Sequence, residues 1–576
     1  MTNYTLNLSM EELEKRTHKD YLMTKKFLKA DAPEYLELAD GDKEALKHLV
    51  KAANILEVIN MRLDHEDNLP FKTFLEQEIK KGNKQAELTK ILFDAQKGVN
   101  ALDTMSEPIF LAKEAPGLPG KGVYPKDLSK EEFHSILIKM LNDGKTDKVR
   151  KILTQRTFVE RDGDELTGID YIDKFKDEFA KMADELDAAS EVSTNSDFNE
   201  YLKLQAKALR EADPMLDAYA DKKWASLQDT PLEFTITREN YADEMTGSVI
   251  ENPELKQLLD ENNISPIPKD FLGGRVGIIN KKGTDALMAI KKYLPTLAKH
   301  MPFSDEYEQN IKPDEDTKQT MVDVDMVTAT GDVGQYRGGI TLAENLPNDD
   351  KLSLTIGGGR RNVYHRQIRF ISDMKKLQER LDAILVKDQH QYYLDEADHW
   401  FTIGHENAHS LGPKKGSEKL GKYRNIIEEN KADMGSLAFV DLLTELGMYT
   451  EEQRKQIIVT TITDNFLKTK PTLSQAHRVR TVMQNKYFAQ RGGYDITSDG
   501  KIHINIDKIV PIAKEMLAEI IRIQIDGDFS KAEKYVNENF VWTDNMELIA
   551  QKLQKVSKAL NGTLETELAD KLLAED

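Results

Sequence analysis

The sequence predicts an α+β protein that is predominantly helical. Two observations lead to this prediction. Apolar residues recur at helical spacing through most of the 576-residue chain, while a shorter central part carries alternating β-branched residues. At this length we expect either several domains or two large lobes, with ample material for a core.

The N-terminal third is predicted to be helical. Residues 115–125 are rich in proline and glycine and mark a boundary or a long connection, after which residues 130–230 return to helix. Within residues 1–115, one apolar stripe approximates the helical repeat, and we expect it to form core rather than a binding face. The stripe consists of Leu36, Leu46, Leu49, Ala53, Leu56 and Ile59.

The pattern becomes extended after residue 232. Alternating β-branched runs occur at residues 232–237, 275–279 and 340–342, and they predict a small sheet or barrel. Residues 281–299 and 363–490 are again mainly helical. A last candidate strand lies at residues 562–567.

One motif within the second helical region indicates chemistry. Residues 404–409 read Gly-His-Glu-Asn-Ala-His, which is an HExxH motif formed by His405, Glu406 and His409. With twelve histidines in the chain, about 0.02 copies would arise by chance. On a helix, residues four apart share a face, so both imidazoles can bind one metal ion and Glu406 can reach a metal-bound water. The motif predicts a zinc hydrolase, most often a peptidase.

A third metal ligand is expected on the next helix. Residues 410–413 read as a helix stop, and a helical stretch follows at residues 423–443. Glu429 and Asp433 lie four apart there, which is the ExxxD arrangement of gluzincins, in which the Glu binds zinc and the Asp holds a ligand imidazole. Glu428 is a rival ligand and Glu418 a weaker one. The chain has no cysteine, so His and carboxylate must supply the ligands.

HExxH followed by Glu-Glu-x-x-Ala-Asp at residues 428–433 resembles the dipeptidyl peptidase III family of zinc metallopeptidases. The better-known members have one more residue between the histidines, a Glu where Asp433 stands, and a longer connection. The resemblance implies two lobes with a central cleft. The lower lobe, residues 1–280 plus 318–355, would contain a small β-barrel. The upper helical zinc lobe would comprise residues 281–317 plus 356–576, with the last strand returning to the barrel.

Further segments that resemble the family fall in family order, and they imply roles for five residues. Glu239 would hold the substrate's N-terminal amine, while Tyr241 and His477 would donate hydrogen bonds to the developing oxyanion. Asn345 and Asn348 would bind the peptide backbone. The family has an arginine where this chain has Thr481, so we ask whether Arg478 or Arg480 stands in for it.

Composition agrees with a large soluble enzyme. The net charge of −20 argues against nucleic acid or anionic membranes as partners. No stretch resembles a signal peptide or a membrane span, which predicts a cytoplasmic protein. We expect a monomer that binds one Zn²⁺ per chain and acts on short peptides.

The function predicted from all of this is a zinc-dependent exopeptidase that removes dipeptides from the free N-terminus of short peptides, with Glu406 acting on the zinc-bound water. One alternative is a related zinc hydrolase with aminopeptidase or endopeptidase specificity. Another is a peptide-binding protein without turnover, although a pure binder has no need of a base such as Glu406.

Overall fold

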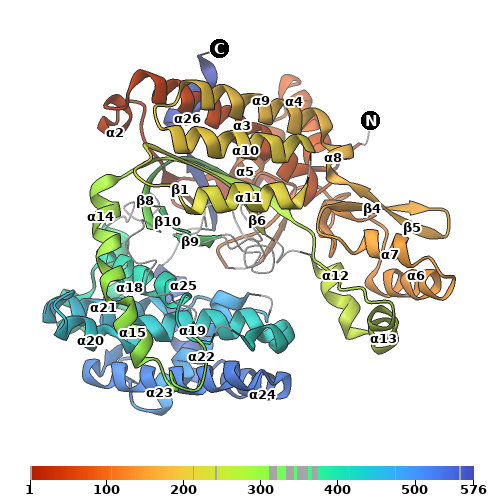
Figure 1. The fold of residues 1–576 in the computed structure, drawn as a ribbon. Helices are drawn as coiled ribbons and strands as arrows, with labels where there is room; N and C mark the ends of the chain where they lie inside the picture. The colour runs from red at the N-terminus through yellow and green to blue at the C-terminus, as the bar shows by residue number, and fades with distance from the viewer. Residues whose placement is uncertain are drawn as a thin grey trace.

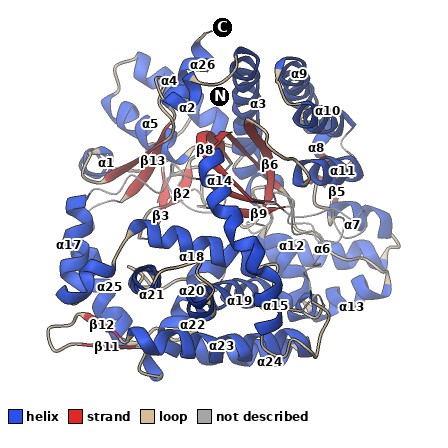
Figure 2. Cartoon of the chain, turned by 60° about the vertical axis from the view of Figure 1, so that its left-hand side comes forward, coloured by secondary structure: helices blue, strands red, loops and turns tan. Residues whose placement is uncertain are grey.

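The computed structural model describes residues 3–575 apart from 106, 212, 240–242, 310–320, 332–342, 347–360, 366–373, 414, 474 and 557–559. The chain is mostly helical, with one five-stranded sheet and several two-stranded ones, so the predicted α+β class is confirmed. Figures 1 and 2 show the five-stranded sheet between two groups of helices, one above and one below.

The longest helix of the N-terminal group, α3 (Asp40–Asp64), confirms most of the predicted stripe. Its residues at positions 46, 49, 53, 56 and 59 are fully buried. The prediction was wrong for Leu36, which is 55% exposed in the short helix α2 and so lies outside the repeat of α3. The elements of this part are α1 (Met10–Thr17), β1 (Leu22–Lys26), α2 (Pro33–Leu36), α3, α4 (Asn68–Lys80), α5 (Lys84–Gln96), β2 (Asn100–Leu102) and β3 (Pro108–Phe110).

The region predicted as continuous helix from residue 130 is interrupted by a hairpin. Strands β4 (Thr157–Asp162) and β5 (Glu165–Asp170) pair antiparallel around a turn that contains Gly163 with φ of 64°. Alternating buried and exposed residues in β4 explain why this segment is a strand. The helices on either side are α6 (Lys130–Asn142), α7 (Thr146–Ile152), α8 (Tyr171–Lys174), α9 (Lys176–Val192), α10 (Ser196–Glu211) and α11 (Pro214–Ala225).

The main sheet is a curled half-barrel rather than a closed barrel. Its strand order is β6-β7-β8-β10-β9, and β6 and β9 form its two edges in the described part of the chain. All neighbours are antiparallel except β8 and β10, which are parallel. The strands are β6 (Leu232–Glu239), β7 (Phe271–Ile279), β8 (Met321–Thr330), β9 (Ala343–Leu346) and β10 (Arg361–His365). Strands β6 and β7 confirm two predicted runs, and residues 340–342 lie outside the described residues.

The last predicted strand exists but pairs elsewhere. Strand β13 (Asn561–Glu565) runs parallel to β1 in a two-stranded sheet of its own, so the expectation that it joins the barrel was wrong. Beyond it, helix α26 (Glu567–Ala574) packs against α3. The C-terminal segment therefore returns to the N-terminal group of helices.

The second group of helices lies on the other side of the sheet (Figure 2). It begins with α14 (Lys281–Met288), which descends from the sheet, and α15 (Leu294–His300). The remaining elements are α17 (Met374–Ile384), α18 (Asp395–Ala408), α19 (Arg424–Ala438), α20 (Val440–Glu445), α21 (Glu451–Asp464), α22 (Ala476–Gln490), β11 (Tyr494–Ile496), β12 (Ile502–Ile504), α23 (Ile506–Asp526), α24 (Phe529–Asn539) and α25 (Asp544–Val556). The short helices α12 (Glu244–Ser248) and α13 (Pro253–Glu261) lie beside α6 instead.

The two largest apolar cores are separated by two strands of the half-barrel, and a smaller third core lies between residues 4 and 115. The sheet core takes side chains from residues 27–278, 322–327, 363 and 568–572, and the helical core takes them from between residues 287 and 553. Two consecutive residues of β8 and two of β10 place their side chains in different cores. Val322 and Val363 belong to the sheet core, whereas Met321 and Tyr364 belong to the helical core. The predicted lobe limits stay a prediction, but β8 and β10 are shared by both cores.

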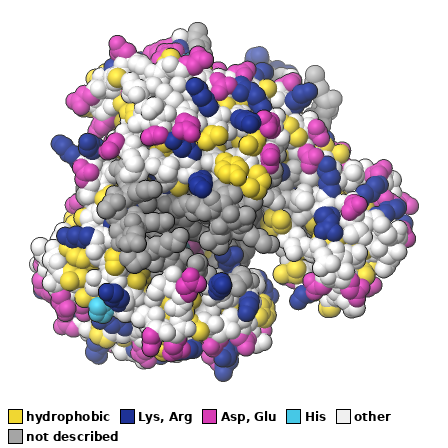
Figure 3. Space-filling model, viewed as in Figure 1, with side chains coloured by type: hydrophobic (Ala, Val, Ile, Leu, Met, Phe, Trp, Pro, Cys, Tyr) yellow, Lys and Arg dark blue, Asp and Glu magenta, His cyan; other side chains and the backbone are white. Residues whose placement is uncertain are grey.

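The surface carries charges of both signs. On the face shown in Figure 3, acidic and basic side chains are interspersed, so the net negative charge is spread over that face rather than gathered at one place. Among the described residues, no helix is long and apolar enough to cross a membrane.

Candidate metal centre

Helices α18 and α19 cross closely because small residues meet where they touch. A Cβ added to Gly404 of α18 would collide with the side chain of Ser436 on α19. A Cβ on Gly435 would lie 2.7 Å from the Cβ of Ala408. The hydroxyl of Ser436 donates a hydrogen bond to the carbonyl of Phe401, at 2.8 Å. This close crossing brings the acidic side chains of α19 within reach of the HExxH motif.

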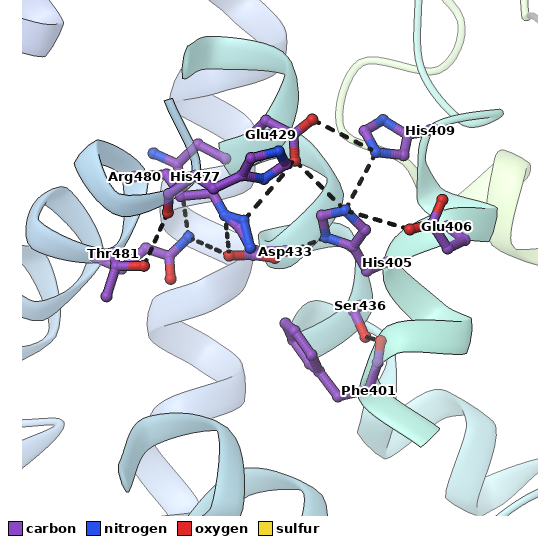
Figure 4. Close-up of polar contacts among 12 residues, drawn as sticks. Phe401, His405, Glu406, His409, Glu429, Asp433, Ser436, His477, Arg480 and Thr481 are labelled. Atoms are coloured by element: carbon purple, nitrogen blue, oxygen red, sulfur yellow. Dashed lines mark hydrogen bonds and ion pairs between the residues drawn. The ribbon is translucent and has the colours of Figure 1, made fainter. Parts of the chain in front are cut away.

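His405, His409 and Glu429 converge at this crossing (Figure 4). The two Nε2 atoms lie 3.2 Å apart, and Glu429 Oε2 lies 3.5 Å from His405 Nε2. Glu429 Oε1 lies 4.0 Å from His409 Nε2. Ligand atoms about 2.0–2.1 Å from a tetrahedral zinc stand roughly 3.3–3.5 Å from each other. The structure thus brings the three predicted ligands together in a group that could hold a metal ion.

One oxygen of the Glu429 carboxylate, Oε2, is a candidate ligand for a cation. This oxygen is buried and accepts no well-aligned hydrogen bond from the described residues, although His477 Nδ1 lies 3.1 Å away. A buried acceptor without a donor is costly. Burial opposes ionisation of Glu429, but the neighbouring imidazoles of His477, His409 and His405 outweigh burial and lower its pKa well below the usual range. The donor set and its geometry therefore fit a divalent metal.

Each histidine is held from its other nitrogen by a carboxylate of α19. His405 donates from Nδ1 to Asp433 Oδ1 at 2.7 Å, as predicted for Asp433. His409 donates from Nδ1 to Glu428 Oε1 at 2.9 Å. Burial would lower the pKa of His409, but its hydrogen bond to Glu428 and the nearby carboxylates raise it. Both rings thus present Nε2 to the same point. Glu428, a rival ligand in the sequence, is an outer partner here.

A cation accompanies each of these two carboxylates. Lys431 Nζ lies 2.7 Å from Glu428 Oε1, and Arg480 Nε lies 2.9 Å from Asp433 Oδ2. Burial would raise the pKa of both carboxyl groups, but Lys431 and His409 lower that of Glu428, and Arg480 and His405 lower that of Asp433. Both carboxylates are therefore ionised acceptors for the imidazole N–H groups. The sequence left the choice between Arg478 and Arg480 open, while Lys431 stands at the i+3 spacing from Glu428 that favours ion pairs.

Of the two candidate arginines, Arg480 lies beside the metal centre and Arg478 does not. Arg478 turns away and donates to Thr469 and to Gln475 Oε1. Arg480 instead reaches the metal centre, with Nη1 3.8 Å from Glu429 Oε2. Thr481 stands where the family has an arginine, and it donates its hydroxyl to the carbonyl of His477.

Two predicted catalytic side chains flank the ligand group. Glu406 Oε1 lies 4.0 Å from His405 Nε2, and the side chain is mostly buried. His477, at the start of α22, is 63% exposed while its Nδ1 faces Glu429. Glu406 is thus enclosed beside the ligands, whereas His477 lies on their solvent side.

Two of the residues predicted to bind substrate, Glu239 and Asn345, lie on strands of the half-barrel. Glu239 ends β6 opposite Phe271, and Asn345 pairs with Asn362 between β9 and β10, but the side chains of Glu239 and Asn345 are outside the described atoms. Tyr241 and Asn348 lie outside the described residues, as does the side chain of Glu418. The predicted roles of these residues stay predictions.

The backbone on both sides of residues 239–242 is firmly held. Arg238 pairs with Asp217 at 3.1 Å and Asp221 at 2.9 Å, both on α11. Asp243 accepts hydrogen bonds from Tyr124 and from the backbone of Lys269, besides capping α12. Arg238 and Asp243, which flank residues 239–242, thus each belong to a buried polar network.

Two solved structures share this fold along almost the full length of the chain. The structure of DPP III from Caldithrix abyssi has a TM-score of 0.77 at 22% identity, covering 98% of this chain and all of that chain. Dipeptidyl-peptidase III from Corallococcus sp. strain EGB has a TM-score of 0.78 at 19% identity, covering 99% of each chain. The resemblance indicated by the motifs is therefore confirmed for the fold.

A curated relative matches at the level of sequence. Nudix hydrolase 3 of Arabidopsis thaliana is 22% identical over an alignment of 490 residues that covers 79% of this chain. The chain spans 58% of the length of that relative. No protein-family model matches the chain.

Proposed function

We propose that this chain is a zinc-dependent peptidase that removes dipeptides from the free N-terminus of short peptides. The observation that carries the proposal is the convergence of two imidazole Nε2 atoms with the Glu429 carboxylate, next to Glu406. Two imidazoles and one carboxylate are a ligand set of zinc peptidases, and they leave a position for water or substrate. The likeness of the fold to dipeptidyl-peptidase III structures supports the same activity.

His405, His409 and Glu429 would hold the zinc ion. When bound, zinc supplies a Lewis acid that polarises the scissile carbonyl and lowers the pKa of a water to about 7. The chain's own part is to fix the orientation of both imidazoles so that Nε2 faces the metal position, which the hydrogen bonds from their Nδ1 atoms to Asp433 and Glu428 do.

Glu406 would act first as a general base and then as a general acid. Its carboxylate takes a proton from the attacking water as the carbon–oxygen bond forms, and delivers it to the leaving amine as the carbon–nitrogen bond breaks. One water and one peptide bond thus become a carboxylic acid and an amine, which together ionise to a carboxylate and an ammonium group. His477, exposed beside Glu429, is a candidate donor to the developing oxyanion, a role it would share with Tyr241.

Release of dipeptides, rather than of single residues, rests on the motif resemblance. Glu239 would bind the substrate's ammonium group, and Asn345 and Asn348 would bind its backbone. Together they would fix the free N-terminus two residues from the cut.

The test is cleavage of unblocked peptides of four to eight residues by the full chain, read by mass spectrometry. We expect dipeptides from the N-terminus of the zinc-loaded protein. We expect no product after chelation, from N-acetylated peptides, or from a Glu406→Gln variant. Single residues would indicate an aminopeptidase, internal cuts an endopeptidase, and peptide binding without turnover a binding protein. Each of these results would overturn dipeptide release.

A further inference from the structure

Helix α23 contributes a side chain to the metal centre from almost a hundred residues beyond the ligands. Gln524 is 2% exposed, and its Nε2 donates to Glu428 Oε2 at 2.9 Å. The other oxygen of Glu428 receives His409 Nδ1 and Lys431 Nζ. Both oxygens of this carboxylate are therefore engaged, and Gln524 is the amide that engages the oxygen facing away from the imidazole.

The connection after the HExxH motif packs on the same helix. A Cβ on Gly412 would lie 3.2 Å from Cδ1 of Ile521, and a Cβ on Gly416 would collide with the backbone carbonyl of Gln524. Both glycines have positive φ, at 96° and 116°, which other residues rarely adopt. Helix α23 is thus fixed against the segment that follows His409 as well as against Glu428.

A carboxylate held at both oxygens has one orientation, whereas a carboxylate held at one oxygen can rotate about its terminal bond. Rotation of Glu428 would weaken the hydrogen bond that fixes the ring of His409. The same arrangement recurs on the other histidine, because Gln484 of α22 donates to Asp433 Oδ2 at 2.8 Å. Each ligand imidazole is therefore followed by a carboxylate and then by a buried glutamine from a different helix.

We infer that Gln524 is a positioning residue of the metal centre, which locks Glu428 against His409 and makes the hold on the metal depend on helix α23. The inference rests on the metal site of the proposed function. It concerns the retention and geometry of the metal rather than the substrate, so it can fail while the site itself stands.

The experiment compares metal release from wild type, Gln524→Met and Gln524→Glu. Zinc is loaded at one equivalent, and its transfer to an excess of a coloured chelator is followed. Gln524→Met keeps the volume without the donor, and Gln524→Glu places a second carboxylate against Glu428. We expect release to be faster by on the order of 3- to 10-fold for the Met variant, and faster still for the Glu variant. Removal of an outer carboxylate itself typically costs ~10–100-fold.

A matched control separates positioning from general weakening. Gln389 is a buried glutamine in the same group of helices, and its hydrogen bonds go to strand β12 rather than to the metal centre: it donates to the carbonyl of Ile504 and accepts from its N–H. We expect Gln389→Met to lower the melting temperature without changing metal release. The visible absorption of the cobalt-substituted protein should change in Gln524→Met and not in Gln389→Met, because it reports the ligand geometry.

Release at the wild-type rate from both Gln524 variants, with an unchanged cobalt spectrum, would overturn the inference. Equally fast release from Gln389→Met would overturn it too. Should Gln524→Met fail to fold, Gln524→Ala serves with the same readouts. If wild type itself holds no metal, the proposed function fails first.

Discussion

The Nε2 atoms of His405 and His409 lie 3.2 Å apart, while their Nδ1 atoms are bound by different carboxylates, Asp433 and Glu428. Two imidazoles aimed at one point in this way need no rearrangement to share a metal ion. The arrangement also assigns different duties to two adjacent glutamates, since Glu429 faces the metal position and Glu428 faces away from it.

The adjacent glutamates should therefore differ when truncated. We expect Glu429→Ala to lose most of its metal, because a ligand is gone. Glu428→Ala should retain the metal with affinity lower by ~10–100-fold, because only an outer hydrogen bond is lost. Metal content after dialysis and competition with a chelator measure both. Equal loss in the two variants would show that the assignment of roles is wrong.

Glu406 should matter for turnover and not for metal. Replacing it by Gln keeps its size and removes the base, so peptide hydrolysis should fall by at least ~10²–10⁴-fold. Metal content should match wild type, because the ligands and their outer partners are untouched. A Glu406→Gln protein with full activity would exclude the mechanism.

The glycine that precedes the motif should be sensitive to a single methyl group. Gly404→Ala would push Ser436 away and separate α18 from α19, costing about 1–3 kcal/mol of unfolding free energy and weakening metal binding. Gly247→Ala is the matched control, since a Cβ at that helical position meets nothing within 4 Å. Thermal unfolding and chelator competition compare the two. Indistinguishable variants would argue against a tight crossing.

A pH effect is expected in the other core. Burial lowers the pKa of Lys269 from 10.5 to about 7. An unfolded chain therefore binds more protons than the folded one between these values, so the free energy of unfolding should rise with pH through that window. Its slope is up to about 1.4 kcal/mol per pH unit.

Lys269→Met should lack this slope, as urea unfolding at pH 7 to 10 would measure. In the structure Lys269 Nζ donates to the carbonyls of Ile152 and Thr154 and to the hydroxyl of Thr157. A constant difference between wild type and variant would mean that these three acceptors keep the ammonium charged.

The metal triad could be predicted from sequence because its spacing is helical. The i and i+4 positions of His405 and His409 fix their shared face whatever surrounds them. The same logic placed Asp433 beside the ligands. It assigned Glu429 as the ligand but kept Glu428 as a rival, because the choice depends on the angle at which α19 crosses α18, and that angle is set by Gly404 and its contacts.

Three features of the fold had no signal in the local sequence. Gln524 meets Glu428 through packing of α23 on α19, and no spacing in the sequence records that contact. Strand β4 alternates in burial in the folded protein, but its residues Thr-Phe-Val-Glu-Arg-Asp do not alternate between apolar and polar, so the sequence did not predict a strand there. The pairing of β13 with β1 rather than with the half-barrel is likewise a tertiary choice that the strand's own residues do not encode.

The parallel pair of β1 and β13 has a consequence for biosynthesis. Strand β1 emerges from the ribosome several hundred residues before its partner β13. At about 5–20 residues per second, β1 waits on the order of half a minute or longer for the strand that completes it. Leu568 and Leu572 of α26 reach the sheet core later still. During that interval the nascent chain displays an unpaired strand and an open apolar surface, the features that holding chaperones bind. A strand synthesised early relative to its partner is thus among the last parts of the fold to be completed.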